Sequence, residues 1–208
     1  MPYRTTFARR RCLFLSGRLA RTPAQVFSRL RYNCAMVKPL EMNYCPCCGH
    51  ALIDKFIFGR TRRKCPDCGF VFFRDPKVAA GVLAEQDGKV LLVKRLYEPH
   101  QGEWALPAGF VEIDEGPVQA ALRELTEETG LVGRIRGIIG TYHIRADPRG
   151  SIVTILYHAQ IVGGELKPGD DAAEVCLFAP DEMPTKLAFA STRSALWRWG
   201  RSKKPNLG

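Results

Sequence analysis

Three glutamates in the middle of the chain have the spacing of a metal site. Glu124, Glu127 and Glu128 lie at positions i, i+3 and i+4, so on a helix they share an arc of about 100° on one face. Carboxylates this close repel one another unless cations neutralise them. Oxygen ligands of this kind favour Mg²⁺ or Mn²⁺. A solvated acidic face is the alternative, but these acids form one stripe instead of alternating with lysines.

A helix over residues 117–129 has to position these glutamates. Pro117 is typical of a helix start, and Gly130 is typical of a helix end. Arg123 can pair with Glu127 and offset part of the repulsion. The face that we expect to be buried holds Val118, Leu122 and Leu125.

Two C-x-x-C pairs, Cys45/Cys48 and Cys65/Cys68, predict a metal site of another kind. Sixteen residues separate the pairs, which is a spacing typical of a zinc ribbon. Four thiolates complete a tetrahedral zinc site and leave no position for water. We therefore expect structural Zn²⁺ that supplies folding energy to a small module, with Cys47 as a spectator.

The segment from residue 109 to residue 131 resembles the Nudix box, G-x₅-E-x₇-R-E-U-x-E-E-x-G-U, where U is a bulky aliphatic residue. The nine fixed positions are all met over these 23 residues: Gly109, Glu115, Arg123, Glu124, Leu125, Glu127, Glu128, Gly130 and Leu131. The chain is therefore similar to the Nudix hydrolases. The resemblance implies an enzyme that hydrolyses acid anhydrides in phosphorus-containing compounds.

The resemblance also implies which groups bind the catalytic Mg²⁺ or Mn²⁺. Glu124, Glu127 and Glu128 would be the ligands. Glu115 would support them or bind a further cation, and the carbonyl of Gly109 would also face a metal. The bound ions would neutralise charge in the transition state and polarise the attacking water.

The catalytic residues that the resemblance implies are Arg123, Glu127, Glu128 and Glu174. Arg123 would hold the glutamates in place. The general base stays open between Glu128 and Glu174, with Glu174 preferred, because family members often supply a late acidic residue from a loop. Asp170 and Asp171 in the same loop are expected to remain in solvent.

The substrate is narrowed by resemblance to two groups that combine a zinc module with a Nudix domain. NADH pyrophosphatases carry a downstream S-Q-P-W-P-F-P-x-S stretch that is absent here. The Leu187–Ser191 ending resembles the shorter group that acts on FAD or ADP-ribose. We therefore expect hydrolysis of ADP-ribose or FAD to AMP and a phosphorylated product. The alternatives are NADH pyrophosphatase activity and a metabolite-sensing regulator with a nucleic-acid-binding ribbon, although such regulators tend to lose the glutamates that are present here.

A dinucleotide substrate also needs aromatic partners for its rings. Most aromatic residues in a domain of this size belong to the core, so no single one is assigned. The candidates are Tyr97, Trp104, Tyr142 and Phe189.

The predicted fold is an α/β/α Nudix sandwich with a mixed sheet, preceded by a small zinc ribbon. Gln86-Asp87-Gly88 between two apolar runs predicts a hairpin. The predicted boundaries are 1–41 for a basic extension, 42–75 for the ribbon, 76–202 for the Nudix domain and 203–208 for a tail. The predicted strands are 78–84, 90–93, 135–144, 152–162 and 175–178, with a further short apolar segment at 105–111 and a second helix at 189–199.

The net charge of +10 is concentrated in residues 1–41, which carry +8 and leave +2 for the rest. We therefore expect no nucleic-acid partner and a ribbon that braces the catalytic domain. The extension fits a transit peptide, a tail or basic arm, or an artefact upstream of a start at Met36 or Met42. The expected location is the cytoplasm, or an organellar matrix if the extension is a transit peptide. No membrane association is expected, and a homodimer is suggested by analogy.

Overall fold

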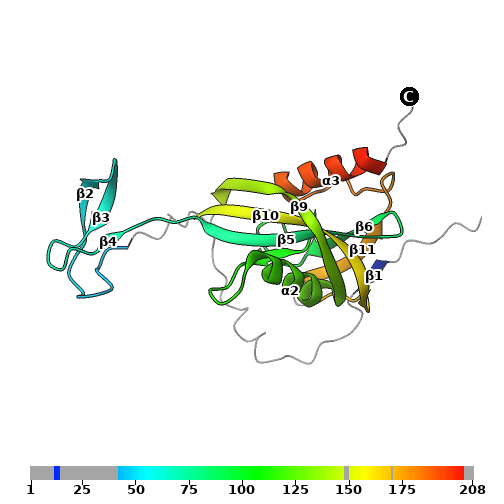
Figure 1. Ribbon diagram of the computed structural model, residues 1–208, viewed down its shortest axis with the longest axis horizontal. Coiled ribbons are helices and arrows are strands. Elements are labelled where there is room, and N and C mark those ends of the chain that lie inside the picture. The colour runs from blue at the N-terminus through cyan, green and yellow to red at the C-terminus, as the bar shows by residue number, and fades with distance from the viewer. Residues whose placement is uncertain (1–11, 15–41, 148–149, 170, 204–208) are drawn as a thin grey trace, which may run out of the picture. The chain divides into compact units, whose positions relative to one another are not determined.

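An eight-stranded sheet is the framework that carries the glutamates (Figure 1). The computed structural model of the chain describes residues 12–14, 42–147, 150–169 and 171–203. The strands of the sheet are β1 (Cys12–Phe14), β5 (Lys77–Gln86), β6 (Lys89–Arg95), β7 (Trp104–Ala105), β8 (Ala108–Phe110), β9 (Leu131–Asp147), β10 (Gly150–Gly164) and β11 (Ala172–Phe178). They follow the order β1-β11-β6-β5-β10-β9, while β7 pairs with β6 and β8 pairs with β5.

Two helices cover opposite faces of this sheet, α2 (Pro117–Thr129) and α3 (Ala190–Lys203). The core on the α2 side contains Ala80, Val82, Ala84, Leu91, Ala120, Ala121, Leu125, Leu131, Ala159 and Ile161. The core on the α3 side contains Leu83, Val90, Leu92, Leu106, Leu156, Cys176, Phe178, Ala195, Leu196 and Trp199. Successive residues of a strand point to opposite faces, so β5 and β6 supply both cores. The predicted α/β Nudix sandwich is confirmed.

The strands β5 and β6 form the predicted hairpin and then separate. Asp87 and Gly88 both have positive φ, 51° and 74°, as a two-residue hairpin turn requires. The two strands pair through Glu85–Val90 and Gln86–Lys89. Beyond these pairs, β8 adds to β5 and β7 adds to β6. This insertion brings the start of the glutamate motif into the middle of the sheet.

Helix α2 has the bounds that Pro117 and Gly130 predict. Its buried face differs from the expected one, however. Leu125 is fully buried, but Val118 is 41% exposed, so the prediction for Val118 was wrong. The small residues Ala120 and Ala121 pack against the sheet instead, because side chains of this size let the helix approach the sheet closely.

The basic extension contributes one strand that its sequence did not predict. β1 pairs antiparallel with β11, with Cys12 opposite Cys176 in the register. The other predictions for residues 1–41, and the predicted tail from 203, concern residues outside those that the structure describes, apart from Lys203. Among the described helices, none is long and apolar enough to cross a membrane.

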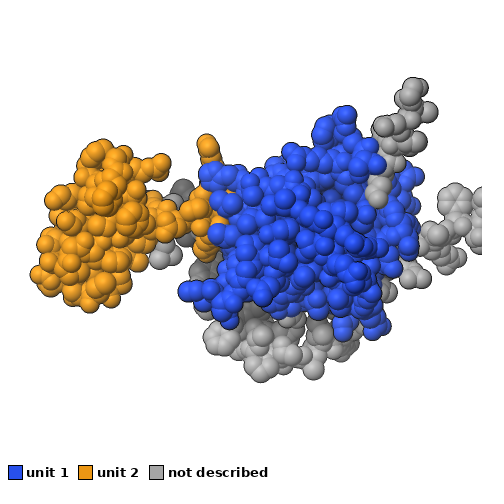
Figure 2. All heavy atoms as spheres, in the orientation of Figure 1, with its two compact units in different colours: residues 1–20, 78–143, 153–208 blue, residues 21–77, 144–152 orange. Residues whose placement is uncertain are grey.

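The chain divides into two compact units, shown in Figure 2. The first comprises residues 1–20, 78–143 and 153–208, and the second comprises residues 21–77 and 144–152. The second unit contains a three-stranded sheet of order β2-β3-β4, built from β2 (Ile53–Ile57), β3 (Arg60–Lys64) and β4 (Val71–Phe72). Its buried core consists of Cys45, Leu52 and Cys65, with Met42 and Phe70 packed against them. So small a core cannot stabilise a fold by apolar burial alone.

Candidate active site and cysteine cluster

The ends of helix α2 are fixed by backbone and side-chain hydrogen bonds. The Gly116 N–H donates to the Gln119 side chain at 2.7 Å, which satisfies a donor at the helix start. At the other end Gly130 adopts a left-handed conformation, φ 70°, and its N–H donates to the carbonyl of Thr126. The three glutamates on the helix are therefore held on a rigid element.

The segment after β10 closes over the C-terminal end of α2. The N–H groups of Glu165, Lys167 and Gly169 donate to the carbonyls of Gly130, Thr129 and Glu128 at 3.2, 3.0 and 2.9 Å. These carbonyls would otherwise have no partner within the helix. A Cβ at position 169 would overlap the helix backbone, so glycine permits this close approach. The segment delivers the loop before β11 to the glutamate stripe.

Arg123 joins the carboxylates of the motif. Its guanidinium donates to both Glu115 oxygens at 2.7 and 3.1 Å, and to Glu124 and Glu127 at 2.8 Å each. It also donates to the carbonyl of Phe110 at 3.1 Å. The hydrogen bonds from Arg123 lower the pKa of Glu115. Arg123 thus contacts three carboxylates of the motif, and Glu115 lies beside it in this network; its orienting role stays a prediction.

Glycine at position 109 is required by the carboxylate of Glu124. Gly109 lies in β8 opposite Ala80, and a Cβ on it would overlap the Glu124 side chain. Next to it, Ala108 faces Gly81 across the strand pair, where a second Cβ would come within 2.5 Å. Ala108 has no positive φ, so alanine is tolerated here because the residue opposite is glycine.

Glu128 is the most deeply buried carboxylate of the motif. Burial raises its pKa well above the usual value, and the charges of Glu124 and Asp171 raise it further. Arg95 and the backbone N–H of Ala108 oppose this rise. Its Oε2 atom is buried and has no hydrogen-bond partner among the described residues. A buried carboxylate oxygen without a partner is costly, and a cation bound there would remove that cost.

Asp171 is the late acidic residue that shares the electrostatic field of the motif. It is exposed, as expected, yet its charge raises the pKa of both Glu124 and Glu128, after burial as the main cause. Its backbone carbonyl accepts a hydrogen bond from Leu96 N–H at 3.0 Å. The sequence named the loop that contains Asp171 but gave this residue no role.

Glu174 lies elsewhere. Its carboxylate pairs with Lys94 at 3.4 Å, and Lys94 also faces the ring of Trp104 at 5.7 Å. Trp104 and Phe178 pack in the core on the α3 side, so Glu174 belongs to the face opposite α2. A bulge between positions 172 and 174 of β11 sets this orientation. The proposed base role of Glu174 stays a prediction.

A cation and an aromatic ring lie near Glu128. The guanidinium of Arg95 stands 5.2 Å from the ring centroid of Phe189, and His100 contacts the same ring edge-on at 5.1 Å. Arg95 also donates from Nε to the carbonyl of Pro99 at 2.8 Å. Of the four aromatic candidates, Phe189 is therefore the one that the structure links to a cation near the motif.

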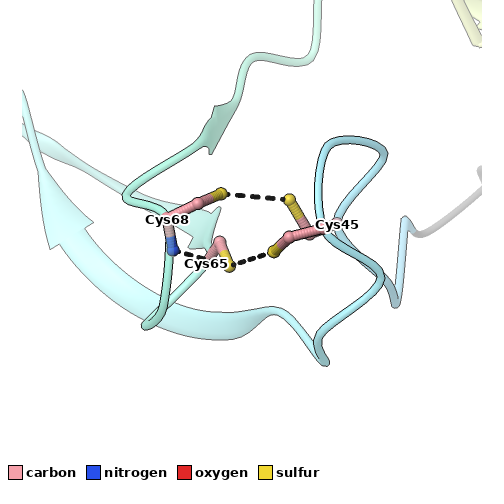
Figure 3. Close-up of side chains that lie close together, drawn as sticks. Cys45, Cys65 and Cys68 are labelled. Carbon is pink, nitrogen blue, oxygen red and sulfur yellow. Dashed lines mark hydrogen bonds between the residues drawn. The ribbon is translucent and has the colours of Figure 1, made fainter.

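The four predicted zinc cysteines meet in the second unit; Figure 3 labels Cys45, Cys65 and Cys68 among them. Their sulfur atoms all lie within 4.8 Å of one another, with Cys45–Cys68 at 3.5 Å and Cys48–Cys65 at 3.4 Å. The coupled thiols shift in opposite directions: the pKa of Cys45 falls to about 6, because burial is outweighed by backbone and thiol hydrogen bonds, whereas the pKa of Cys48 rises to about 12, because the His50 backbone N–H is outweighed by burial and the neighbouring thiols. The convergence of four sulfur atoms in one place fits a zinc ion. Cys47 is exposed and is not one of the four clustered sulfurs.

Comparison with known proteins identifies the family. The model of the NUDIX domain matches residues 75–199, more than half of the chain. The chain therefore belongs to the NUDIX family, and it is a Nudix hydrolase.

Relatives support this assignment with sequence and structure. A Methanocaldococcus jannaschii protein named ADP-ribose pyrophosphatase is 44% identical over 115 residues, which are 55% of this chain and 68% of that protein. A NUDIX hydrolase structure from Nitrosomonas europaea has a TM-score of 0.71 and 35% identity, covering 78% of this chain and 92% of its own. The NUDIX domain of Shewanella oneidensis NrtR, complexed with ADP ribose, has a TM-score of 0.52 and 27% identity, covering 63% and 90%.

Proposed function

We propose that this chain is a Mg²⁺- or Mn²⁺-dependent ADP-ribose diphosphatase that releases AMP and ribose 5-phosphate. The observation that carries the proposal is the buried Oε2 atom of Glu128, which has no hydrogen-bond partner among the described residues and lies in the field of Glu124 and Asp171. Three carboxylates in one partly buried place are stable together only when a cation or protons neutralise them.

The donors at this place fit a hard divalent cation. Glu124, Glu127 and Glu128 would hold it, because carboxylate oxygens are the preferred ligands of Mg²⁺ and Mn²⁺. When bound, the metal would neutralise charge on the diphosphate and activate a water molecule for attack on phosphorus. Arg123 holds Glu124 and Glu127 from one side, while Glu115 anchors Arg123.

Asp171 is the carboxylate that we assign as proton acceptor. Glu124 and Glu127 are engaged by Arg123, and Glu174 is engaged by Lys94. Asp171 remains next to the glutamates, is accessible to water, and makes no salt bridge among the described residues. A carboxylate with these properties can take the proton of an attacking water.

Arg95 and Phe189 are the groups that we assign to substrate recognition. A guanidinium near the metal ligands can bind a phosphate oxygen or a ribose hydroxyl, and an aromatic ring can stack on adenine. The His100 ring packs against the Phe189 ring at an angle of 74°. This pairing suits a substrate with both a phosphate and a planar base, as ADP-ribose and FAD have.

ADP-ribose is preferred over FAD because two of the similar proteins are linked to it. One is the relative named ADP-ribose pyrophosphatase, and the other is a NUDIX domain complexed with ADP ribose. FAD, NADH, diadenosine polyphosphates and dNTPs are the competitors to be excluded. We further propose that the cysteine cluster binds one structural Zn²⁺.

The test is a hydrolysis assay with purified full-length chain and Mg²⁺ or Mn²⁺, followed by chromatography of the products. ADP-ribose should give AMP and ribose 5-phosphate at a higher kcat/KM than any competitor. Glu128→Gln should lower kcat about 10²-fold or more, because a lost metal ligand removes several kcal/mol of transition-state stabilisation. If the folded, metal-loaded chain cleaves none of these substrates, the enzyme assignment is contradicted and a metabolite sensor is favoured.

A further inference from the structure

On one face of the sheet β2-β3-β4, the strands β2 and β3 carry lysines and arginines but no acidic residue. In the register of β2 and β3, Ile53 lies opposite Lys64, Lys55 opposite Arg62, and Ile57 opposite Arg60. Alternation places these six residues on the same side. We call this side the cationic face; its cations are Lys55, Arg60, Arg62 and Lys64. Asp54, the acidic residue of these strands, points to the other side.

Two aromatic rings lie on the cationic face. Phe58 and Phe73 stack with centroids 6.3 Å apart and planes 17° apart, and the Arg62 guanidinium lies 4.6 Å above Phe73. Phe58 is 75% exposed and Phe73 is 45% exposed. Phe58 also occupies a left-handed position of the hairpin turn, φ 52°, where a bulky residue is unfavourable. Neither core packing nor turn geometry accounts for a phenylalanine there.

On the opposite face of the sheet, the cation Arg63 forms hydrogen bonds within the fold. Arg63 donates to the carbonyl of Met42 at 3.2 Å, to Asn43 at 3.3 Å and to Asp54 at 3.4 Å. By contrast, the four cations of the cationic face make no salt bridge with a carboxylate in the described part of the chain. Phe56, 74% exposed, stands on the opposite face, across from Thr61. The two faces of one hairpin therefore differ in available charge.

We propose that the cationic face is a binding site for single-stranded nucleic acid, with its lysines and arginines on phosphates and the Phe58–Phe73 pair against bases. Single strands expose base faces that stack on aromatic side chains, while their backbone binds cations. A second copy of the chain or a folded protein would need complementary acids or a larger apolar surface. The acid-free pattern favours a polyanion, and the exposed rings favour one that has bases.

The test measures binding of a fluorescein-labelled oligodeoxythymidine of about 12 nucleotides to the zinc-loaded full-length chain by fluorescence anisotropy. Phe58→Ala should weaken binding about fivefold or more, which is the loss expected for one stacked base. Phe58→Leu should behave like Phe58→Ala, and Phe58→Tyr should bind like the parent chain. Phe56→Ala is the matched control and should leave binding unchanged.

The contribution of the cations to oligonucleotide binding is tested separately, by measuring how the affinity depends on salt concentration. Lys55→Ala should reduce the slope of log affinity against log salt by about 0.7, whereas Arg134→Ala, an exposed cation of the first unit, should not. The Arg-rich residues 1–41 add the same background to every variant, so the differences between variants are the result. Zinc content and ADP-ribose hydrolysis should be unchanged in all of them.

Two results would overturn the proposal. The first is equal affinity of the Phe58→Ala and Phe56→Ala chains. The second is a loss of heparin binding in Phe58→Ala that is as large as its loss of oligodeoxythymidine binding. Heparin is a polyanion without bases, so stacking cannot explain such a loss. Either result would leave the face without a role in stacking nucleic-acid bases.

Discussion

The glutamate motif and the cysteine cluster both fit metal ions, but they depend on metal in different ways. Helix α2 is capped at both ends, packs Leu125 into a large core, and has Arg123 among its carboxylates. The cysteine unit has a core of three buried residues, two of which are the cysteines themselves. We therefore expect the first site to fold without metal and the second to need metal to complete its core.

This difference means that loss of metal should affect activity at one site and stability at the other. We expect the ion at the glutamate motif to be needed for chemistry but not for folding. We expect the ion at the cysteine cluster, whose ligands are also its core, to be needed for folding. Variants of each site can show whether the two differ in this way.

Loss of zinc should have the largest effect. Cys65→Ser should abolish zinc binding and leave the amides of β2 and β3 unprotected in hydrogen exchange, because the metal replaces a core. The amides of β5 and β6 should stay protected, since the cores around them contain no residue of the ribbon. The sequence favours a bracing ribbon; loss of protection in β5 and β6 would support bracing and contradict independence.

Replacement of Asp171 should have the next largest effect, on kcat. Asp171→Asn should lower kcat about 10²-fold or more, because it removes the proton acceptor, while Glu174→Gln should change kcat far less. Steady-state kinetics with ADP-ribose would measure both. The reverse ranking would restore Glu174 as the base and contradict our assignment.

Gly109→Ala should lower kcat/KM about 10²-fold, since a methyl group would displace the Glu124 carboxylate and small displacements at a catalytic site are costly. Gly137→Ala is the matched control, because a Cβ at Gly137 would meet nothing within 4 Å. Equal activity of the two variants would show that Glu124 need not stay where the structure places it.

Arg123→Lys should have the smallest effect in energy, about 1–3 kcal/mol less free energy of unfolding. Lysine keeps the charge but cannot reach three carboxylates with a planar fork. Urea denaturation would measure the difference, with the exposed Arg134→Lys as control. An unchanged midpoint would mean that the carboxylates find other partners.

The features that could be predicted from the sequence are those that short local motifs determine. Pro117 and Gly130 fix the helix, Asp87-Gly88 fixes the hairpin, and cysteine spacing brings the four thiols together. The sequence could not predict what depends on register. No residue pattern indicates the bulge between positions 172 and 174 of β11, which accompanies the pairing of Glu174 with Lys94. Net charge, likewise, averages over both faces of the β2–β3 hairpin and conceals the side that carries Lys55 and Arg62.

The three hydrogen bonds between the segment 165–169 and the end of α2 also bear on motion. Because Glu165, Lys167 and Gly169 are tied to the helix backbone, this stretch cannot swing as a lid without breaking all three bonds. These bonds favour a fixed position of the segment against the helix, and Asp171 follows Gly169 by two residues. We therefore expect the length of this stretch to set how far Asp171, the proton acceptor that we propose, lies from the glutamates, and expect that adding or removing one residue there lowers activity.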